Sequence, residues 1–160
     1  MTVSTTQLPE LSERDRVRFL AKVNQVENGC WEWTSAKQPT GYGLFFFKGA
    51  ARLAHRISWT IAHGTIPDGL MIDHRCHNRG CVNPEHLWLA TRKQNGENLA
   101  HARSDSRTGI RGVEQRKNGR WRAYIVHNGV NTHLGFFGTA EEASTVAAAK
   151  RSELFTHSQN

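Results

Sequence analysis

The chain has 160 residues, which is enough for one medium-sized domain or two small ones. It carries 21 Lys and Arg residues against 14 Asp and Glu residues, a net charge of +7, and five tryptophans. This balance fits a polyanionic partner such as nucleic acid, although a basic surface can also serve solubility alone. No apolar run approaches the length of a membrane-spanning helix, so we expect no membrane partner.

Helix and strand signals alternate through the first two thirds of the chain. Ser12 and Thr91 stand where helix N-caps are expected, and short aromatic segments flank a loop that contains Pro39 and Gly41. In chain order we expect an unstructured lead over residues 1–10, a helix over 13–24, a hairpin formed by 30–34 and 42–48, a helix over 52–63, strands over 70–74 and 87–90, and a helix from 91 to about 103.

The last third of the chain has a different pattern. Asn118-Gly119 and Asn128-Gly129 are strong signals for β-hairpin turns, and Thr139 precedes an alanine-rich segment with acidic residues in its first turn, where the helix dipole favours them. We expect strands over residues 112–117, 120–127 and 131–136 and a helix over 139–154. The expected fold class is therefore α+β, with a three-stranded antiparallel sheet and one packed helix at the C-terminal end.

The three cysteines can join a single metal site. Cys76, Cys81 and His86 follow one another at intervals of five residues, and Cys30 is the only other cysteine. Zinc takes four ligands, and thiolates with imidazole are a usual structural set. The alternative is that the cysteines are buried thiols or belong to a disulfide framework, but their odd count and the polar, signal-free N-terminus argue against a framework. We predict one structural Zn²⁺ bound by Cys30, Cys76, Cys81 and His86, in a chain that is not secreted.

A second group of polar residues flanks the same loop. Asp73 and His74 end the strand before it, and Asn95 lies early in the helix after it, so the three can meet when the helix folds onto the strands. Oxygen ligands from Asp73 and Asn95 suit Mg²⁺ or a similar hard cation, and His74 can accept a proton from water near neutral pH. Together they suit phosphodiester hydrolysis, although each residue taken alone is more simply an ordinary strand or helix residue.

Several motifs of the first module carry a family resemblance. They are Ala54-His55-Arg56, Gly64–Gly69, Ile72-Asp73-His74, Asn83–Leu87 and Asn95. With these motifs, residues of about 30–100 resemble an HNH endonuclease of the homing and phage type, and the Cys-His box is similar to that of the His-Cys box homing endonucleases. The resemblance implies a ββα-metal fold in which His74 is the general base, Asp73 and Asn95 bind the catalytic cation, and His86 replaces the middle asparagine of many HNH motifs as a zinc ligand.

The last third carries a resemblance of its own. Its motifs are Ile110–Val113, Gly119–Trp121 and Leu134–Ala143. Residues of about 108–155 resemble the plant ethylene-response-factor (APETALA-type) DNA-binding domain, in which the sheet enters the major groove. Alternation along the strand puts Arg120, Arg122 and Tyr124 on one face, from which arginines can contact guanine or phosphates. The expected DNA-binding residues are Arg111, Arg116, Arg120, Arg122 and Tyr124.

The two halves together predict a DNA endonuclease of the homing or phage type, with catalysis in the first module and targeting of double-stranded DNA in the second. A restriction endonuclease with the same chemistry and a DNA-binding regulator with an inactive nuclease half are the alternatives. A double-strand cut would most simply need a homodimer, and we expect a cytoplasmic location in a bacterial or phage-infected cell. The expected boundaries are 1–24 for the lead and first helix, 25–103 for the nuclease domain, 104–109 for a linker, 110–155 for the DNA-binding domain and 156–160 for a tail.

Overall fold

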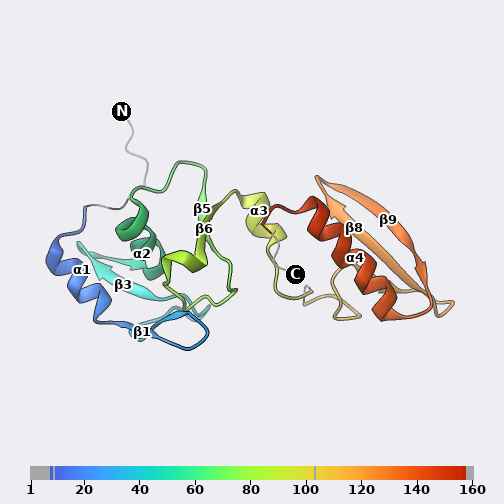
Figure 1. Cartoon of the computed structure of the whole chain (residues 1–160), viewed down its shortest axis with the longest axis horizontal. Coiled ribbons are helices and arrows are strands. Elements are labelled where there is room, and N and C mark those ends of the chain that lie inside the picture. The colour runs from blue at the N-terminus through green and yellow to red at the C-terminus, as the bar shows by residue number, and fades with distance from the viewer. Residues whose placement is uncertain (1–7, 9, 103, 158–160) are drawn as a thin grey trace. The chain divides into compact units, whose positions relative to one another are not determined.

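The computed structural model describes residues 8, 10–102 and 104–157 of a mixed α/β chain (Figure 1). The chain divides between Asn95 and Gly96 into two compact units, an N-terminal unit of residues 1–95 and a C-terminal unit of residues 96–160. The division comes earlier than the linker expected at 104–109. Much of the expected lead, Arg103 at that linker's edge and the end of the expected tail lie outside the described residues.

The elements of the N-terminal unit are short. In chain order they are α1 (Glu13–Leu20), β1 (Val23–Gln25), β2 (Trp31–Trp33), β3 (Leu44–Phe47), β4 (Ala50–Leu53), α2 (Ala54–His63), β5 (Met71–His74), the 3-10 helix η1 (Pro84–His86) and β6 (Leu87–Ala90), followed by α3 (Arg92–Glu97), which crosses into the C-terminal unit. The cap predicted at Ser12 is confirmed, because its Oγ accepts the Asp15 N–H at 3.2 Å. Helix α1 ends at Leu20, and the last residues of the expected helix belong to β1 instead.

The predicted hairpin between residues 30–34 and 42–48 is wrong. Strand β2 pairs with β1, and β3 pairs with β4, both antiparallel. Lys48 and Gly49 both have positive φ, 43° and 77°, so they form a tight turn that pairs β3 with the residues directly after it. Because β4 takes Arg52 and Leu53, helix α2 begins at Ala54 and not at Arg52.

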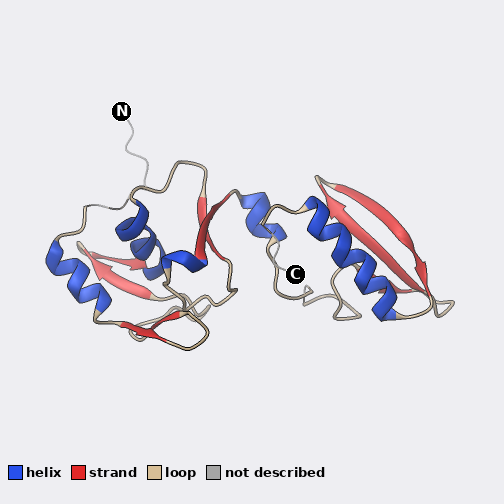
Figure 2. Ribbon diagram, in the orientation of Figure 1, coloured by secondary structure: helices blue, strands red, loops and turns tan. Residues whose placement is uncertain are grey.

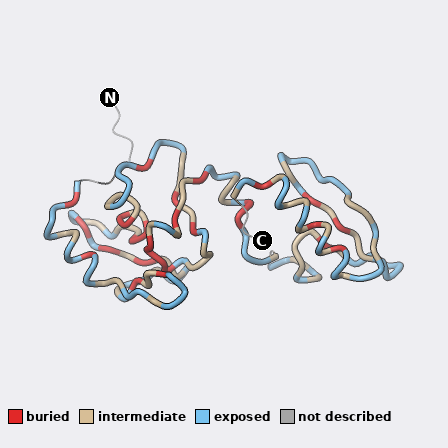
Figure 3. The backbone as a smooth tube through the Cα atoms, in the orientation of Figure 1, coloured by how far each residue is buried: buried red, intermediate tan, exposed pale blue. Residues whose placement is uncertain are grey.

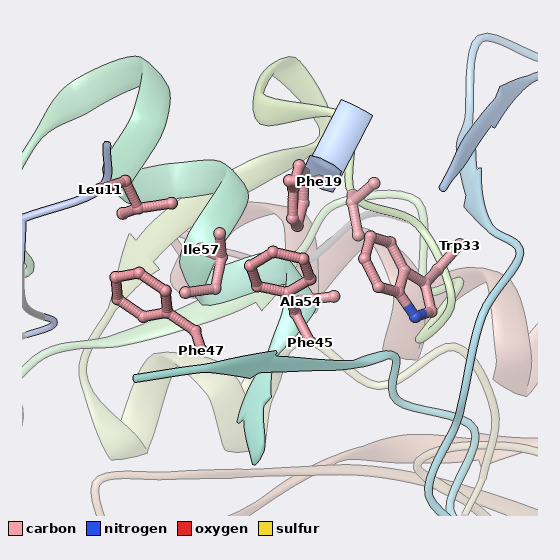
Figure 4. Close-up of a cluster of buried hydrophobic side chains, with 8 residues drawn as sticks. Leu11, Phe19, Trp33, Phe45, Phe47, Ala54 and Ile57 are labelled. Carbon is pink, nitrogen blue, oxygen red and sulfur yellow. The ribbon is translucent and has the colours of Figure 1, made fainter. Parts of the chain in front are cut away.

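Aromatic side chains form the main core of the N-terminal unit (Figure 4). The rings of Phe19, Trp33 and Phe45 contact one another, with centroids 4.9 to 6.0 Å apart. Gly43 lies so close to this core that an added Cβ would come within 2.6 Å of the Trp33 ring. Its carbonyl also accepts the Ala54 N–H at 2.8 Å, which fixes the start of α2. Any side chain at Gly43 would therefore disturb both the core and the position of α2.

Strands β5 and β6 confirm the strands expected over 70–74 and 87–90 and pair antiparallel, with His74 opposite Leu87. The predicted cap at Thr91 is confirmed, because its Oγ1 accepts the Gln94 N–H at 3.2 Å. Helix α3, however, ends at Glu97, six residues short of the expected end near 103. The carbonyls of Glu97 and Leu99 instead accept hydrogen bonds from the Arg111 guanidinium, at 2.6 and 3.1 Å.

The C-terminal unit is an antiparallel sheet with one helix (Figure 2). Its elements are β7 (Val113–Gln115), β8 (Trp121–His127), β9 (Val130–Phe137) and α4 (Ala140–Leu154), and the strand order is β7-β8-β9. The predicted turn at Asn128-Gly129 has positive φ at both residues, and Thr139 forms a capping box with Glu142. Ala123, Ala143 and their neighbours form a core between the sheet and α4, so burial is concentrated inside each unit (Figure 3).

Among the described residues, no helix combines the length and the apolar character needed to span a bilayer.

Candidate active site and metal cluster

Four side chains of the N-terminal unit lie close together, one from just before β2 and three from the segment between β5 and β6. Cys30, Cys76, Cys81 and His86 each offer a ligand atom, and these atoms lie within 4.8 Å of one another. His86 Nδ1 is 3.5 Å from Cys30 Sγ and 3.7 Å from Cys81 Sγ. Sulfur and nitrogen ligands of a tetrahedral zinc ion stand about 3.6 Å apart. The cluster therefore fits a single tetrahedral ion of this kind, and none of its cysteines is in a disulfide.

Backbone pairing brings Cys81 beside Cys30, far away in the sequence. The Val82 N–H donates to the Trp31 carbonyl at 2.7 Å, and Cys81 forms a β-bridge to Glu32 in β2. Because β2 starts directly after Cys30, this pairing aligns the two thiols.

The side chain of Asn83 positions the histidine of the cluster. Its Nδ2 donates to the Gly29 carbonyl at 2.7 Å, and its Oδ1 accepts the Glu85 N–H at 3.0 Å at the start of η1. Helix η1 carries His86, whose ring would lie 3.4 Å from a Cβ added at Gly29. Asn83 thus ties the loop before Cys30 to the turn that presents His86.

The thiols compete for ionisation. A hydrogen bond with Cys81 lowers the pKa of Cys76, the same interaction raises the pKa of Cys81, and burial raises the pKa of Cys30. Three thiolates at this spacing would repel one another strongly unless a cation lay between them. The donor set and its electrostatics therefore both fit a bound metal ion.

His74, the expected base, is buried and oriented by the same loop. Only 4% of its surface is exposed, and its Nε2 lies 3.0 Å from the Cys81 carbonyl oxygen. Because a carbonyl oxygen only accepts, Nε2 carries the hydrogen and the lone pair of the neutral ring is on Nδ1. Burial also lowers the pKa of His74 from its ordinary value, which favours this neutral form. The cluster residue Cys81 thus fixes the tautomer of His74.

The two expected cation ligands lie on different elements. Asp73 pairs with Trp88 across the β5–β6 ladder, and its carboxylate accepts the His74 backbone N–H at 2.8 Å and the Trp88 indole N–H at 3.3 Å. Asp73 and His74 are consecutive in β5, and consecutive residues of a regular strand point to opposite faces of the sheet. Asn95 is half-buried in α3, where its N–H donates to the Thr91 carbonyl at 3.0 Å.

Two rings beside His74 had no role in the sequence interpretation. The His55 ring lies 4.9 Å from the His74 ring, centroid to centroid, at 65°, and Tyr42 lies 5.3 Å from His55 and 5.9 Å from His74. The hydrogen bond from Ala54 to Gly43 explains this meeting, because His55 follows Ala54 and Tyr42 precedes Gly43. Burial lowers the pKa of His55 to about 3, so its ring is neutral at neutral pH. In the sequence, the Ala54-His55-Arg56 motif was the feature that could have marked His55 as a site residue.

Arg122 lies at the centre of the exposed face of the C-terminal sheet. It stands opposite Glu114 on one side and Phe136 on the other, so the three side chains form a row across the strands. Its guanidinium lies 3.5 Å from Glu114 and 5.2 Å from the centre of the Tyr124 ring. It also donates to His133 at 3.4 Å. The face is therefore rich in hydrogen-bonding and aromatic groups.

The other expected DNA-binding arginines differ in their surroundings. Arg120 is exposed, donates to the Phe136 carbonyl at 2.8 Å and lies over the Phe136 ring, while exposed Arg116 pairs with Glu114 at 3.0 Å. Arg111 is half-buried, and its guanidinium lies over the Phe155 ring and donates to the carbonyls of Glu97 and Leu99, at and just after the end of α3. The structure thus gathers Arg116, Arg120, Arg122 and Tyr124 around one sheet face and leaves Arg111 half-buried, bound to backbone carbonyls.

Comparison with known proteins also relates the segment around β5 and β6 to HNH endonucleases. Residues 52–97 match the HNH endonuclease family model. The chain is 31% identical to Protein 2.8 of Escherichia phage T7 over 88 residues, which cover 54% of this chain and 60% of that protein. It is 29% identical to the "Uncharacterized HNH endonuclease L560" of Acanthamoeba polyphaga mimivirus over 126 residues, 78% of this chain and 63% of that protein.

A further relative has a higher identity over a shorter segment. The "Uncharacterized gene 5.3 protein" of Enterobacteria phage T3 is 61% identical over 73 residues, which cover 41% of this chain and 72% of that protein. The chain spans about three fifths of the length of the phage T7 and mimivirus relatives above. No solved structure matches the chain significantly. Residues 52–97 therefore match the HNH endonuclease family model, and the chain belongs to the family of the phage T3 gene 5.3 protein.

Proposed function

We propose that this protein is a metal-dependent endonuclease that hydrolyses phosphodiester bonds in double-stranded DNA. The observation that carries the proposal is the state of His74, a buried neutral imidazole whose Nε2–H is held by the Cys81 carbonyl within a domain that matches HNH endonucleases. The net charge of +7 supports an anionic substrate.

His74 is the general base in this proposal. Its Nδ1 takes one proton from a water molecule, the resulting hydroxide attacks the phosphorus, and the bond to the leaving sugar oxygen breaks. That oxygen then takes a proton from solvent or from the protonated His74. Asp73 and Asn95 would hold a divalent cation such as Mg²⁺, which would supply positive charge to stabilise the phosphate and the leaving oxygen. The contacts that hold Asp73 in place restrain its carboxylate for this role.

We assign Cys30, Cys76, Cys81 and His86 to one structural zinc ion. The tetrahedral spacing of the ligand atoms supports this assignment. Because Cys81 also holds His74, loss of the metal would disturb the base as well as the fold.

We assign DNA targeting to the exposed sheet face of the C-terminal unit. The similarity of its motifs to the ethylene-response-factor domain and its three surface arginines, Arg116, Arg120 and Arg122, support this assignment. Arg111 acts in this proposal mainly by holding the chain after α3, because its guanidinium is already bound to backbone carbonyls.

The phage relatives support a phage-type or homing role inside an infected bacterial cell. With one His74 site in each chain, a double-strand cut would use two chains, one for each strand.

Replacing the base tests the proposed activity. His74→Ala should lower the turnover of plasmid cleavage by roughly 100- to 10,000-fold, since general-base catalysis supplies about that factor. DNA affinity, measured without added magnesium, should stay within about two-fold of wild type. His63→Ala, at the exposed end of α2, is the matched control and should cleave normally. Turnover of His74→Ala within a few-fold of wild type would refute the role of His74, and wild-type protein that cuts no DNA with any divalent cation would refute the proposal.

A further inference from the structure

His55 is an anomaly next to the proposed base. It is 4% exposed, as His74 is, yet its buried ring Nδ1 has no hydrogen-bond partner among the residues that the structure describes. Its Nδ1 is fully enclosed. A buried polar group without a partner destabilises a fold, and a phenylalanine would fill similar space without that cost. Such groups are rare, and a catalytic role is one of the explanations for them.

His55 lies close enough to His74 for both rings to contact one water molecule. The ring centroids are 4.9 Å apart and the rings are steeply inclined to each other. Two ring nitrogens that share one bridging water stand about 4.5 Å apart. Rings whose centroids are 4.9 Å apart can have one nitrogen each at that separation, so one water can contact both rings. Because His74 uses Nε2 for the Cys81 carbonyl, its Nδ1 is the nitrogen that such a water would meet.

We propose that His55 binds the attacking water through its Nε2 and holds it toward Nδ1 of His74. This inference rests on the proposed function. Nε2 is the nitrogen assigned because Nδ1 of His55 is enclosed. As His74 takes one hydrogen of the water, the other hydrogen stays on the oxygen and is held by His55, so the hydroxide keeps its orientation toward the phosphorus. His55 itself gains and loses no proton in this step.

The surroundings of His55 suit an uncharged hydrogen-bonding group. Burial, with a smaller contribution from His74, holds the pKa of His55 near 3, so His55 does not add a positive charge that would oppose protonation of His74. Tyr42 packs on both rings and keeps the pair in place.

The decisive variant is His55→Phe, which keeps a ring against His74 and Tyr42 but removes both nitrogens. We expect the kcat for plasmid cleavage to fall by about 30-fold or more with KM nearly unchanged, since the water is needed only in the chemical step. The melting temperature should rise, because the buried, unpartnered Nδ1 is gone. A purely structural role predicts that activity and stability change together. This opposite change distinguishes the two roles.

Two further variants complete the test. His55→Gln restores a hydrogen-bonding group and should recover part of the lost kcat, and it remains informative if His55→Phe folds poorly. His63→Phe makes the same change at the exposed end of the same helix and should leave kcat unchanged. If His55→Phe keeps kcat within about three-fold of wild type while His74→Ala is inactive, the water-binding role is refuted and the proposed function stands. If wild type itself cuts no DNA, the proposed function fails instead.

Discussion

The pH dependence of folding stability should carry the signature of His55. Its folded-state pKa is held near 3, whereas a histidine in the unfolded chain has an ordinary pKa of 6.5. Well above pH 6.5 the His55 side chain is neutral in both the folded and the unfolded state, so it adds no pH dependence to the free energy of unfolding. As the pH falls below 6.5, the unfolded chain takes up a proton that the folded protein does not, so stability is lost progressively until the pH reaches about 3.

The size of the effect follows from these two values. At pH 5.5 His55 is mostly protonated in the unfolded chain. This protonation lowers the free energy of unfolding by about 1.4 kcal/mol at pH 5.5 and by less than about 0.1 kcal/mol at pH 7.5. Any folded-state pKa below about 4 gives nearly the same result, because the buried ring is then neutral at both pH values. His55→Phe lacks the titrating group and should escape this loss.

Urea unfolding followed by tryptophan fluorescence, at pH 7.5 and pH 5.5 with constant zinc, measures the effect. The wild type should lose about 1.4 kcal/mol more than His55→Phe between the two conditions. Titration of the metal ligands affects both proteins alike and cancels in the comparison. His63→Phe, which removes an exposed histidine, should keep the wild-type pH dependence. A difference between wild type and His55→Phe below about 0.5 kcal/mol would show that His55 is protonated readily in the folded protein, contrary to its burial.

Three further outcomes are expected. Cys30→Ser should lower the bound zinc well below one ion per chain and lower the melting temperature, and a variant that keeps stoichiometric zinc with unchanged stability would contradict the four-ligand site. Arg122→Ala should weaken DNA binding and reduce the slope of log affinity against log salt by about one unit, whereas an unchanged slope and affinity would remove Arg122 from the interface. Thr139→Ala removes one half of the capping box of α4 and should cost about 1 kcal/mol in urea unfolding, and a change below about 0.3 kcal/mol would mean that the cap contributes little.

Local signals in the sequence were sufficient where neighbouring residues determine the structure. The turn at Asn128-Gly129, the cap at Thr91 and the capping box at Thr139 all depend on backbone conformations or hydrogen bonds within a few residues. The β5–β6 pair was predictable for a related reason, because a strand on each side of the Cys-His loop is the simplest way to close it. The position of the four cluster residues in the chain also indicated one site, and their ligand atoms do converge.

Contacts between distant residues decided the rest. The partner of β3 could not be read from the aromatic pattern, because the Lys48-Gly49 turn competes with a longer loop and tight turns close at a lower entropic cost. Likewise, only the folded chain reveals that Arg111 is held by backbone carbonyls, since a basic residue looks the same in sequence whether it faces solvent or the interior.

The sequence by itself determined which chemistry this chain can hold: three thiols and a histidine at metal-ligand spacing, and an Asp-His pair at a strand end before a helix that carries Asn95. Tertiary structure alone decided how that chemistry is arranged. In the folded chain His55 is buried against His74, and Nε2 of His74 is hydrogen-bonded to the Cys81 carbonyl. The physical reason is that spacing along a chain limits which ligands can meet, whereas burial, tautomer and ring orientation depend on the packing of segments that the sequence keeps far apart.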